Sequence, residues 1–534
     1  MTHFAYYEYI EFDGELFFTA VLLPSKKGTF PTVIIRSPYV SSLADKAEED
    51  ILQMYLSHYE SWLTNGYAVV FQHCRGQGKS TGGFVPYIHE REDGLKLRQW
   101  IREQYFYNGE LFLLGGSYTA SVHYTTAPFE SDIKGAVLEV QDTERYRLWY
   151  RNGQMRKGHA NWHFSLYKPK CNLNKTHCMS SFSHLPISGL SERVLGERAE
   201  DFEQMLEAQR PADSFWNTRF GGSEARNVTD NIPFPVLFTT GFHDFYVGGM
   251  FAMWNSMSEQ ARMRCAMLVS PYDHGDSYKV EDGLAFPKGQ RREQFGSEYS
   301  VNWFDYIRKG TSLPFETGVI TYYRLFENIW KCDFYKNKTD LLEIPLGEGQ
   351  VSFDYNPKEP PAFCEEGAFQ RNHFVGAHVI SLYTSPLDTD VFVKGKMEAI
   401  LRVSSTCPDT SFYISVSIKK PQGDYRLRHD ITSISYQLGN YIENETVSLQ
   451  FSFDEHAFLL EKGECLRVDI CSTDDNVYVS HTNMKGPYYL QTESQVATNC
   501  VYLNDSKLFL PIEQQGREFE SSRPRLKNLV KSRA

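Results

Sequence analysis

Short apolar segments that alternate with helical periods constrain the fold of this chain most strongly. The runs TVIIR at 32–36, YAVVFQ at 67–72 and ELFLL at 110–114 are rich in β-branched and aromatic residues. Between them, 47–64 and 92–104 repeat apolar residues at helical spacing. Short apolar strands separated by helices are typical of a parallel sheet with helices on both faces. The first part of the chain is therefore predicted to be an α/β domain.

The pattern changes twice further along the chain. After about Gln141 the residues are rich in Arg, Trp, His, Asn and Ser with helical pieces, and the α/β pattern then returns with PVLFTT and CAMLVS. From about Glu343 the helical signal gives way to β-rich segments separated by turns, which is typical of a two-sheet sandwich. We therefore expect an α/β core in two parts, 1–144 and 231–342, an inserted helical cap at 145–230, and a C-terminal all-β domain at 343–534.

Composition excludes several classes of protein. A chain of 534 residues needs more than one hydrophobic core, and its net charge of −12 argues against binding to nucleic acid. No run approaches the ~18 apolar residues of a membrane helix, and the N-terminus lacks the features of a secretory signal. The ten cysteines are scattered, as in a reduced cytoplasmic protein. We expect no cofactor, metal, nucleic-acid or membrane partner, and a homo-oligomer stays open.

The central motif is Gly115-Gly116-Ser117-Tyr118, which follows ELFLL directly and precedes a run of small residues. A strand, a sharp turn and a helix in this order form a nucleophile elbow, in which the strained serine stands out from the sheet. The backbone N–H of Tyr118 would then point toward the reacting carbonyl oxygen. The motif alone does not separate a nucleophile from an idle serine, because Thr119 replaces the second glycine of G-x-S-x-G.

A serine nucleophile needs a base and an acid that orients it. PVLFTT leads into Gly241-Phe242-His243-Asp244, and CAMLVS leads into Pro271-Tyr272-Asp273-His274. Both loops leave the carboxyl ends of strands, where open α/β sheets place their sites, and the order Ser, Asp, His is that of α/β-hydrolases. We predict Asp244 as the acid and His274 as the base. His243 is a weaker base, since it shares a loop with Asp244.

Other polar residues follow strands of the same sheet. Tyr39 comes just after TVIIR, so its hydroxyl could donate to an oxyanion, and a packed aromatic ring is equally compatible with its position. Glu139, Asp142 and Glu144 lie at or after the strand 135–140. Carboxylates there, Asp142 and Glu144 above all, could hold the free α-amino group of a substrate, although ordinary solvated acids are the commoner case.

Several motifs in one order resemble a known family. IIRSPY, VVFQHCRGQGKSTGGF, EREDG, GGSY, GFHDFYVGG and PYDHG are similar to those of the bacterial cocaine esterase family, which includes X-prolyl dipeptidyl peptidases, α-amino-acid ester hydrolases and glutaryl β-lactam acylases. The resemblance implies an α/β-hydrolase core, a helical cap and a C-terminal jelly roll. It also implies Ser117, Asp244 and His274 as the catalytic triad, with the Tyr39 hydroxyl and the Tyr118 N–H as oxyanion hole.

The chain departs from the family pattern at three places. Ala120 stands where the family usually has glycine, His73-Cys74 where it has an acid and a small residue, and Tyr272-Asp273 where it has Trp-Ser before the histidine. None of these changes removes the catalytic groups. The last two lie near the triad and are expected to affect substrate preference.

We expect a serine hydrolase that cleaves an ester or amide of a small-molecule substrate through an acyl-Ser117 intermediate. An acyl esterase is the leading hypothesis. An X-prolyl dipeptidyl peptidase and an α-amino-acid ester or β-lactam acyl hydrolase remain alternatives, because the same triad serves all of them. A hypothesis of another class is a non-catalytic protein that binds ligands through its β-sandwich.

Overall fold

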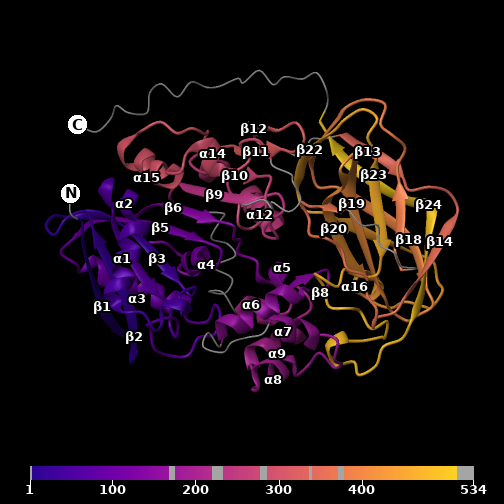
Figure 1. Cartoon of the computed structure of the whole chain (residues 1–534), viewed down its shortest axis with the longest axis horizontal. Helices are drawn as coiled ribbons and strands as arrows, with labels where there is room; N and C mark the ends of the chain where they lie inside the picture. The colour runs from indigo at the N-terminus through magenta and orange to yellow at the C-terminus, as the bar shows by residue number, and fades with distance from the viewer. Residues whose placement is uncertain are drawn as a thin grey trace.

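A computed structural model describes residues 3–167, 175–218, 232–276, 286–335, 340–370 and 378–513. Figure 1 shows a helix-covered sheet, a group of short helices beside it, and two β-sheets at the other side of the molecule. The chain passes from the first sheet into the helices, returns to the same sheet, and then enters the all-β part.

The core sheet has ten strands in the order β1-β2-β4-β3-β5-β6-β9-β10-β11-β12. From β4 to β11 neighbouring strands are parallel, as predicted, but β1, β2 and β4 pair antiparallel at one edge and β12 pairs antiparallel at the other. The strands are β1 (Phe4–Phe12), β2 (Glu15–Leu23), β3 (Phe30–Ser37), β4 (Ala68–His73), β5 (Tyr107–Gly116), β6 (Ile133–Glu139), β9 (Val236–Gly241), β10 (Ala266–Ser270), β11 (Ile320–Arg324) and β12 (Ile329–Asp333).

Helices cover both faces of this sheet. Ile51, Leu63 and Trp303 belong to one buried apolar cluster, whereas Leu97 and Trp254 belong to another. The sheet therefore lies between two apolar layers, which agrees with the helical periods in the sequence. The helices are α1 (Glu48–His58), α2 (Glu60–Thr64), α3 (Glu90–Arg102), α4 (Tyr118–Tyr124), α12 (Val247–Ser256), α13 (Glu259–Arg262), α14 (Arg291–Phe295) and α15 (Tyr299–Lys309).

The segment between β6 and β9 is mostly helical in its described part. It also contains a small hairpin, β7 (Tyr150–Arg151) and β8 (Gln154–Met155). The helical pieces expected in this segment are short; for example, Gly196 adopts a left-handed conformation and ends one helix before the next begins. The helices are α5 (Arg145–Trp149), α6 (Lys157–Tyr167), α7 (Lys175–Ser181), α8 (Leu190–Leu195), α9 (Glu200–Glu207) and α10 (Ser214–Thr218).

The all-β part contains two antiparallel sheets in its described ranges and includes a short α-helix, α16 (Ile434–Leu438). One sheet has the order β21-β18-β24-β17-β22, with β13 and β14 also on β24, and the other has the order β15-β20-β19-β23-β16. The expected boundary at 342/343 falls inside β13, which pairs with β24 from its first residue. The strands are β13 (Asp340–Pro345), β14 (Gln350–Tyr355), β15 (Phe369–Gln370), β16 (Ile380–Tyr383), β17 (Val391–Gly395), β18 (Glu398–Ser405), β19 (Ser411–Lys420), β20 (Gly423–Ser433), β21 (Val447–Ser452), β22 (His456–Leu460), β23 (Leu466–Cys471) and β24 (Ala497–Ile512).

Candidate active site

Ser117 lies at the sharp turn between β5 and α4. Its backbone φ is 55°, a left-handed value that is uncommon for residues other than glycine. Thr119 braces the turn, because its hydroxyl donates to the Gly116 carbonyl and accepts from the Gly116 N–H, both at 2.7 Å. A Cβ on Gly115 would lie 2.1 Å from the Thr119 carbonyl oxygen, so only glycine fits there. Thr119 thus supports the elbow at the position of the missing glycine.

Asp244 and His274 come together at the carboxyl ends of β9 and β10. His274 Nδ1 lies 3.1 Å from Asp244 Oδ1. Asp244 is fully buried and also accepts hydrogen bonds from the Tyr246 N–H at 3.0 Å and the Thr240 hydroxyl at 3.2 Å. These donors hold the carboxylate in one orientation toward the imidazole.

The pKa of His274 is raised above its usual value. Burial acts to lower it, but the charge of Asp244 and the hydrogen bond to it outweigh burial, and Asp273 adds to the same effect. The side chain is 33% exposed, so the imidazole is not sealed off from solvent or substrate. Phe245 stacks on the imidazole with ring centroids 4.7 Å apart. The pair therefore has the form of a base that is oriented by an acid.

The hydroxyl of Tyr39 lies 3.5 Å from Ser117 Oγ. It also accepts a hydrogen bond from Trp162 Nε1 at 3.3 Å, and the backbone N–H of Tyr118 is a further donor to it. The two oxyanion donors expected from the sequence thus meet beside the serine. Within the described ranges, Ser117 makes its side-chain hydrogen bond with Tyr39 and none with His274.

The side chain of Tyr118 anchors the turn from below. It is buried, donates to Glu90 Oε1 at 2.7 Å and accepts from the Tyr87 N–H at 2.8 Å. Glu90 in turn pairs with buried Arg36 at 3.2 Å. This network holds Tyr118 at the start of α4, directly after Ser117. Sequence reasoning did not assign Glu90 a role, although it begins the EREDG motif.

Asp142 and Glu144 do not converge on the serine as free carboxylates. Asp142 is buried, and its Oδ1 accepts from the Glu144 N–H at 2.9 Å. Its Oδ2 faces Gly249 of α12 so closely that a Cβ there would lie 1.5 Å away. Burial, opposed by Arg145 and Arg147, raises the pKa of Asp142 to about 7. Glu144 lies 3.4 Å from Arg147.

The helical segment contributes residues that the sequence did not single out. Trp162 of α6 reaches Tyr39, and His159 of the same helix packs edge-on against Phe245 with ring centroids 4.9 Å apart. Residues at helical spacing on one helix thus border both Tyr39 and the ring that covers His274. Their aromatic type was the only signal in the sequence, and it is shared by many core residues.

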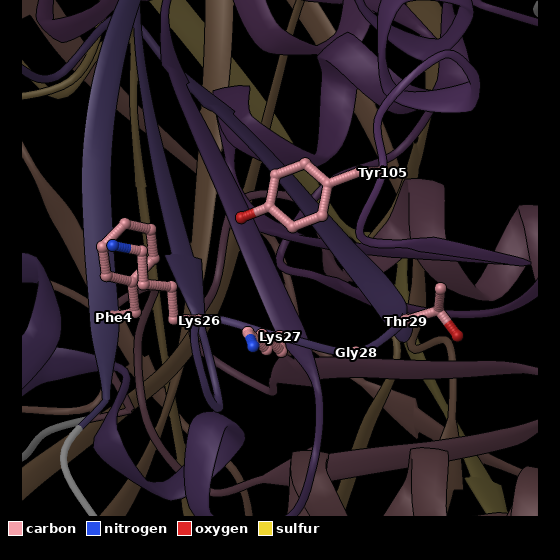
Figure 2. A pocket seen from close by; sticks show the side chains of 6 residues that line it. All are labelled: Phe4, Lys26, Lys27, Gly28, Thr29 and Tyr105. Atoms are coloured by element: carbon pink, nitrogen blue, oxygen red, sulfur yellow. The ribbon is translucent and has the colours of Figure 1, made fainter.

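Two pockets differ in their relation to this site. A small cavity lies between the core and the helical segment, and Tyr87, which stacks on Tyr118, is part of its wall. A wider surface pocket is lined by Phe4, Lys26, Lys27, Gly28, Thr29 and Tyr105, as Figure 2 shows. These residues precede or adjoin the starts of β1, β3 and β5, so this pocket lies at the sheet edge opposite to Ser117.

The described ranges contain no group of three or more His, Cys, Asp or Glu side chains that could hold a metal ion. No helix within them has the length and apolar character needed to cross a membrane.

Two family models match this chain. The model of X-Pro dipeptidyl-peptidase (S15 family) matches residues 13–276, and that of the X-Pro dipeptidyl-peptidase C-terminal non-catalytic domain matches 356–507. Cocaine esterase from Rhodococcus sp. (strain MB1 Bresler) is 27% identical over 143 residues. That alignment spans 26% of this chain and 24% of the esterase.

Solved structures share the fold over nearly the whole chain. An aminopeptidase from the marine sediment archaeon Thaumarchaeota archaeon has a TM-score of 0.80 at 16% identity and covers 96% of both chains. An α-amino acid ester hydrolase has a TM-score of 0.78 at 17% identity and covers 96% of this chain and 97% of its own. The family matches and these folds agree on the core and on the all-β part, and the chain belongs to the X-Pro dipeptidyl-peptidase (S15) family of hydrolases.

Proposed function

We propose that this chain hydrolyses an acyl ester through an acyl-Ser117 intermediate. The observation that carries the proposal is the strained backbone of Ser117 at the same sheet edge as the hydrogen-bonded pair His274–Asp244. Strain of this kind costs on the order of 1–3 kcal/mol and is found mainly at functional sites. An idle serine would not require it.

In the proposed mechanism His274 removes the proton of the Ser117 hydroxyl as this oxygen attacks the ester carbonyl carbon. Asp244 engages Nδ1, which leaves Nε2 as the ring nitrogen that would accept the serine proton and later protonate the leaving alkoxide. The serine hydroxyl first leaves Tyr39 and turns toward His274, a contact that in such enzymes often tightens only with substrate bound. Water then attacks the acyl-enzyme by the same route and releases the acid.

The oxyanion that forms on the carbonyl carbon needs donors. The hydroxyl of Tyr39 and the backbone N–H of Tyr118 are assigned to this role, because the hydroxyl lies 3.5 Å from Ser117 Oγ and the N–H donates to that hydroxyl. Burial raises the pKa of Tyr39 against the opposing effect of its hydrogen bonds, so the phenol keeps its proton near neutral pH. A neutral phenol can donate to the oxyanion as charge develops.

We further assign α5 to α10 as a cap over the site and the two C-terminal sheets as a jelly roll. Trp162 and His159 support the cap assignment, since both come from α6 and border residues at Ser117 and His274. The cap would then select the acyl group by the shape of its aromatic wall. Two packed antiparallel sheets of seven and five strands support the jelly roll.

A plain acyl ester is favoured over a substrate with a free α-amine. An amine anchor needs an accessible carboxylate. Asp142 is buried against Gly249, and Glu144, although 40% exposed, already has Arg147 as a cationic partner at 3.4 Å. We therefore expect esters with a free α-amine and their N-acetylated twins to react at similar rates. A preference for the free amine that Glu144→Gln removes would favour the peptidase or amino-acid ester alternatives.

Replacing the proposed nucleophile tests the reaction itself. Ser117→Ala is expected to fold and to lose on the order of 10⁴-fold or more in turnover, because triad members act as a unit. Turnover of p-nitrophenyl esters and labelling by a fluorophosphonate probe measure this. Ser121→Ala, which changes a nearby hydroxyl on α4, is the matched control and should still be labelled. Failure of the unmodified chain to label would favour a non-catalytic binding protein.

A further inference from the structure

We infer that the all-β domain holds the acid of the proposed triad in place, with His243 as a positioning residue. The inference rests on the proposed role of Asp244. His243 immediately precedes Asp244 in the loop between β9 and α12 and plays no part in the mechanism above. Figure 1 shows this part of the core facing β20 and β22 of the all-β domain.

The imidazole of His243 is docked on the all-β domain by a direct hydrogen bond. Its Nε2 lies 2.9 Å from the hydroxyl of Tyr425 on β20. Gly367 backs against the ring, since a Cβ there would lie 2.8 Å from His243 Cδ2, and the φ of +78° also favours glycine. Residues of the all-β domain therefore contact the ring on two sides.

The residue before His243 is docked in the same way. Phe242 stacks on His456 of β22 with ring centroids 5.0 Å apart and planes 7° from parallel. His456 also meets the His243 ring edge-on at 5.0 Å. The two side chains that precede Asp244 thus both pack on the all-β domain. A shift of that domain relative to the core would therefore displace both of them.

Backbone bonds connect this docked segment to the loop of the base. The Phe242 N–H donates to the Ser270 carbonyl at 2.8 Å, and the His243 N–H donates to the Tyr272 carbonyl at 3.0 Å. The acid loop is therefore held by the loop of His274 on one side and by the all-β domain on the other. The distance between Asp244 and His274 depends on both.

The imidazole of His243 does not change its protonation state near neutral pH. Burial, with a contribution from Arg428 and against that of Glu366, lowers the pKa of His243 to about 3. Burial also holds the pKa of His456 below its usual value. Arg428 and Glu366 pair with each other at 2.7 Å. A change in the pH profile of a His243 variant therefore reports on the Asp244–His274 pair.

Variants of the docked pair test the inference on the full chain. His243→Leu and Tyr425→Phe remove the hydrogen bond, whereas His243→Gln keeps a polar group that can reach Tyr425. Tyr478→Phe is the matched control, because it removes a tyrosine–histidine hydrogen bond of the same length in the same domain, 2.9 Å from its hydroxyl to His429 Nε2, and keeps the bond between Tyr425 and His243. Hydrolysis of a p-nitrophenyl ester is measured across pH, beside Ser117→Ala.

His243→Leu and Tyr425→Phe are expected to lower kcat by about tenfold with little change in KM, since a displacement of ~1 Å at a reacting group costs up to 10²-fold. The acid limb of kcat/KM should move to lower pH, because His274 loses part of the effect of Asp244. His243→Gln should restore most of kcat. Tyr478→Phe should leave both kcat and the position of the acid limb unchanged.

If Tyr425→Phe and Tyr478→Phe have the same kcat and the same acid limb, the positioning role of His243 is overturned. Tyr425→Phe removes a single oxygen, so it decides the question even where His243→Leu fails to fold. Loss of activity in Ser117→Ala with an unaffected Tyr425→Phe would reject this inference alone. Activity retained by Ser117→Ala would reject the proposed function and this inference with it.

Discussion

At the scale of single residues, Ser117 carries the clearest signature of the site. Its positive φ is maintained by Thr119, which makes two hydrogen bonds with the backbone of Gly116. The sequence presents Thr119 as a departure from G-x-S-x-G, whereas in the structure the threonine hydroxyl stabilises the turn. A substitution that looks like a loss of the motif is therefore compatible with the elbow.

The hydroxyl of Tyr39 is predicted to act on the transition state. Tyr39→Phe should lower kcat by about 10²–10³-fold, the usual loss for one oxyanion donor, with KM nearly unchanged. Steady-state kinetics on a p-nitrophenyl ester measure both constants. Trp162→Phe, which removes the other side-chain donor to this hydroxyl, is the comparison and should have a smaller effect. A rise in KM alone would make Tyr39 a wall of the pocket instead.

The raised pKa of His274 predicts where the rate falls on the acid side of the pH profile. A general base must be neutral, so kcat/KM should fall as pH drops through this pKa, at a midpoint above the ~6.5 of a free histidine. Asp244→Asn removes the main raising charge and should move the limb to lower pH as well as lowering the rate. Asp273→Asn should give a smaller shift in the same direction. A limb that neither change moves would show that another group titrates.

At the scale of elements, three strand-to-loop junctions deliver the site. Ser117 follows β5, while β9 and β10 end in register at Gly241 and Ser270. Because parallel strands in register end at the same side of the sheet, the loops that follow them lie next to each other. The sheet thus brings Asp244 and His274 together although 30 positions separate them in sequence.

Close backbone packing within the β5–α4 unit predicts intolerance of any side chain at Gly115. Gly115→Ala places a Cβ 2.1 Å from the Thr119 carbonyl oxygen, so the turn must open. Overpacking of this kind costs typically ~1–3 kcal/mol. Thermal unfolding should show a lower midpoint and ester hydrolysis a large loss. Gly158→Ala in α6, where nothing lies within 4 Å, is the control and should be neutral or slightly stabilising.

At the scale of the whole molecule, one arginine ties the helical segment to the all-β domain. Arg151 Nε lies 2.7 Å from Asp430 Oδ1, and its Nη1 lies 2.9 Å from Asp454 Oδ1. All three side chains are largely buried. Together with the His243 contact, this means that the all-β domain touches both the segment proposed as cap and the loop of the proposed acid.

Loss of that arginine is predicted to destabilise the chain strongly. Arg151→Met removes the ion-pair partner that Asp430 and Asp454 share, and breaking a buried ion pair costs about 3–5 kcal/mol. Denaturant unfolding followed by fluorescence should show this. Arg198→Met, which breaks an exposed pair with Glu200, should leave the unfolding midpoint close to that of the unmodified chain, because solvent screens exposed ion pairs. Equal stability of the two variants would contradict the role of Arg151 in joining the parts.

Much of the architecture could be predicted from local sequence. The apolar runs before Ser117, Asp244 and His274 correspond to β5, β9 and β10, because buried parallel strands have a continuous apolar signal. The edge pairings could not be predicted in the same way. The antiparallel addition of β12 and the start of the all-β domain at β13 depend on partners distant in sequence.

By itself, the sequence determined the order of the elements and the residues that follow each strand, since apolar periodicity and turn chemistry act within a few residues. Only the tertiary structure decided what those residues face. It buried Asp142 against Gly249, brought the Tyr39 hydroxyl to Ser117, and seated His243 on Tyr425. Contacts of this kind join residues far apart in the chain, and no local pattern encodes them, because they arise only when separate elements pack together.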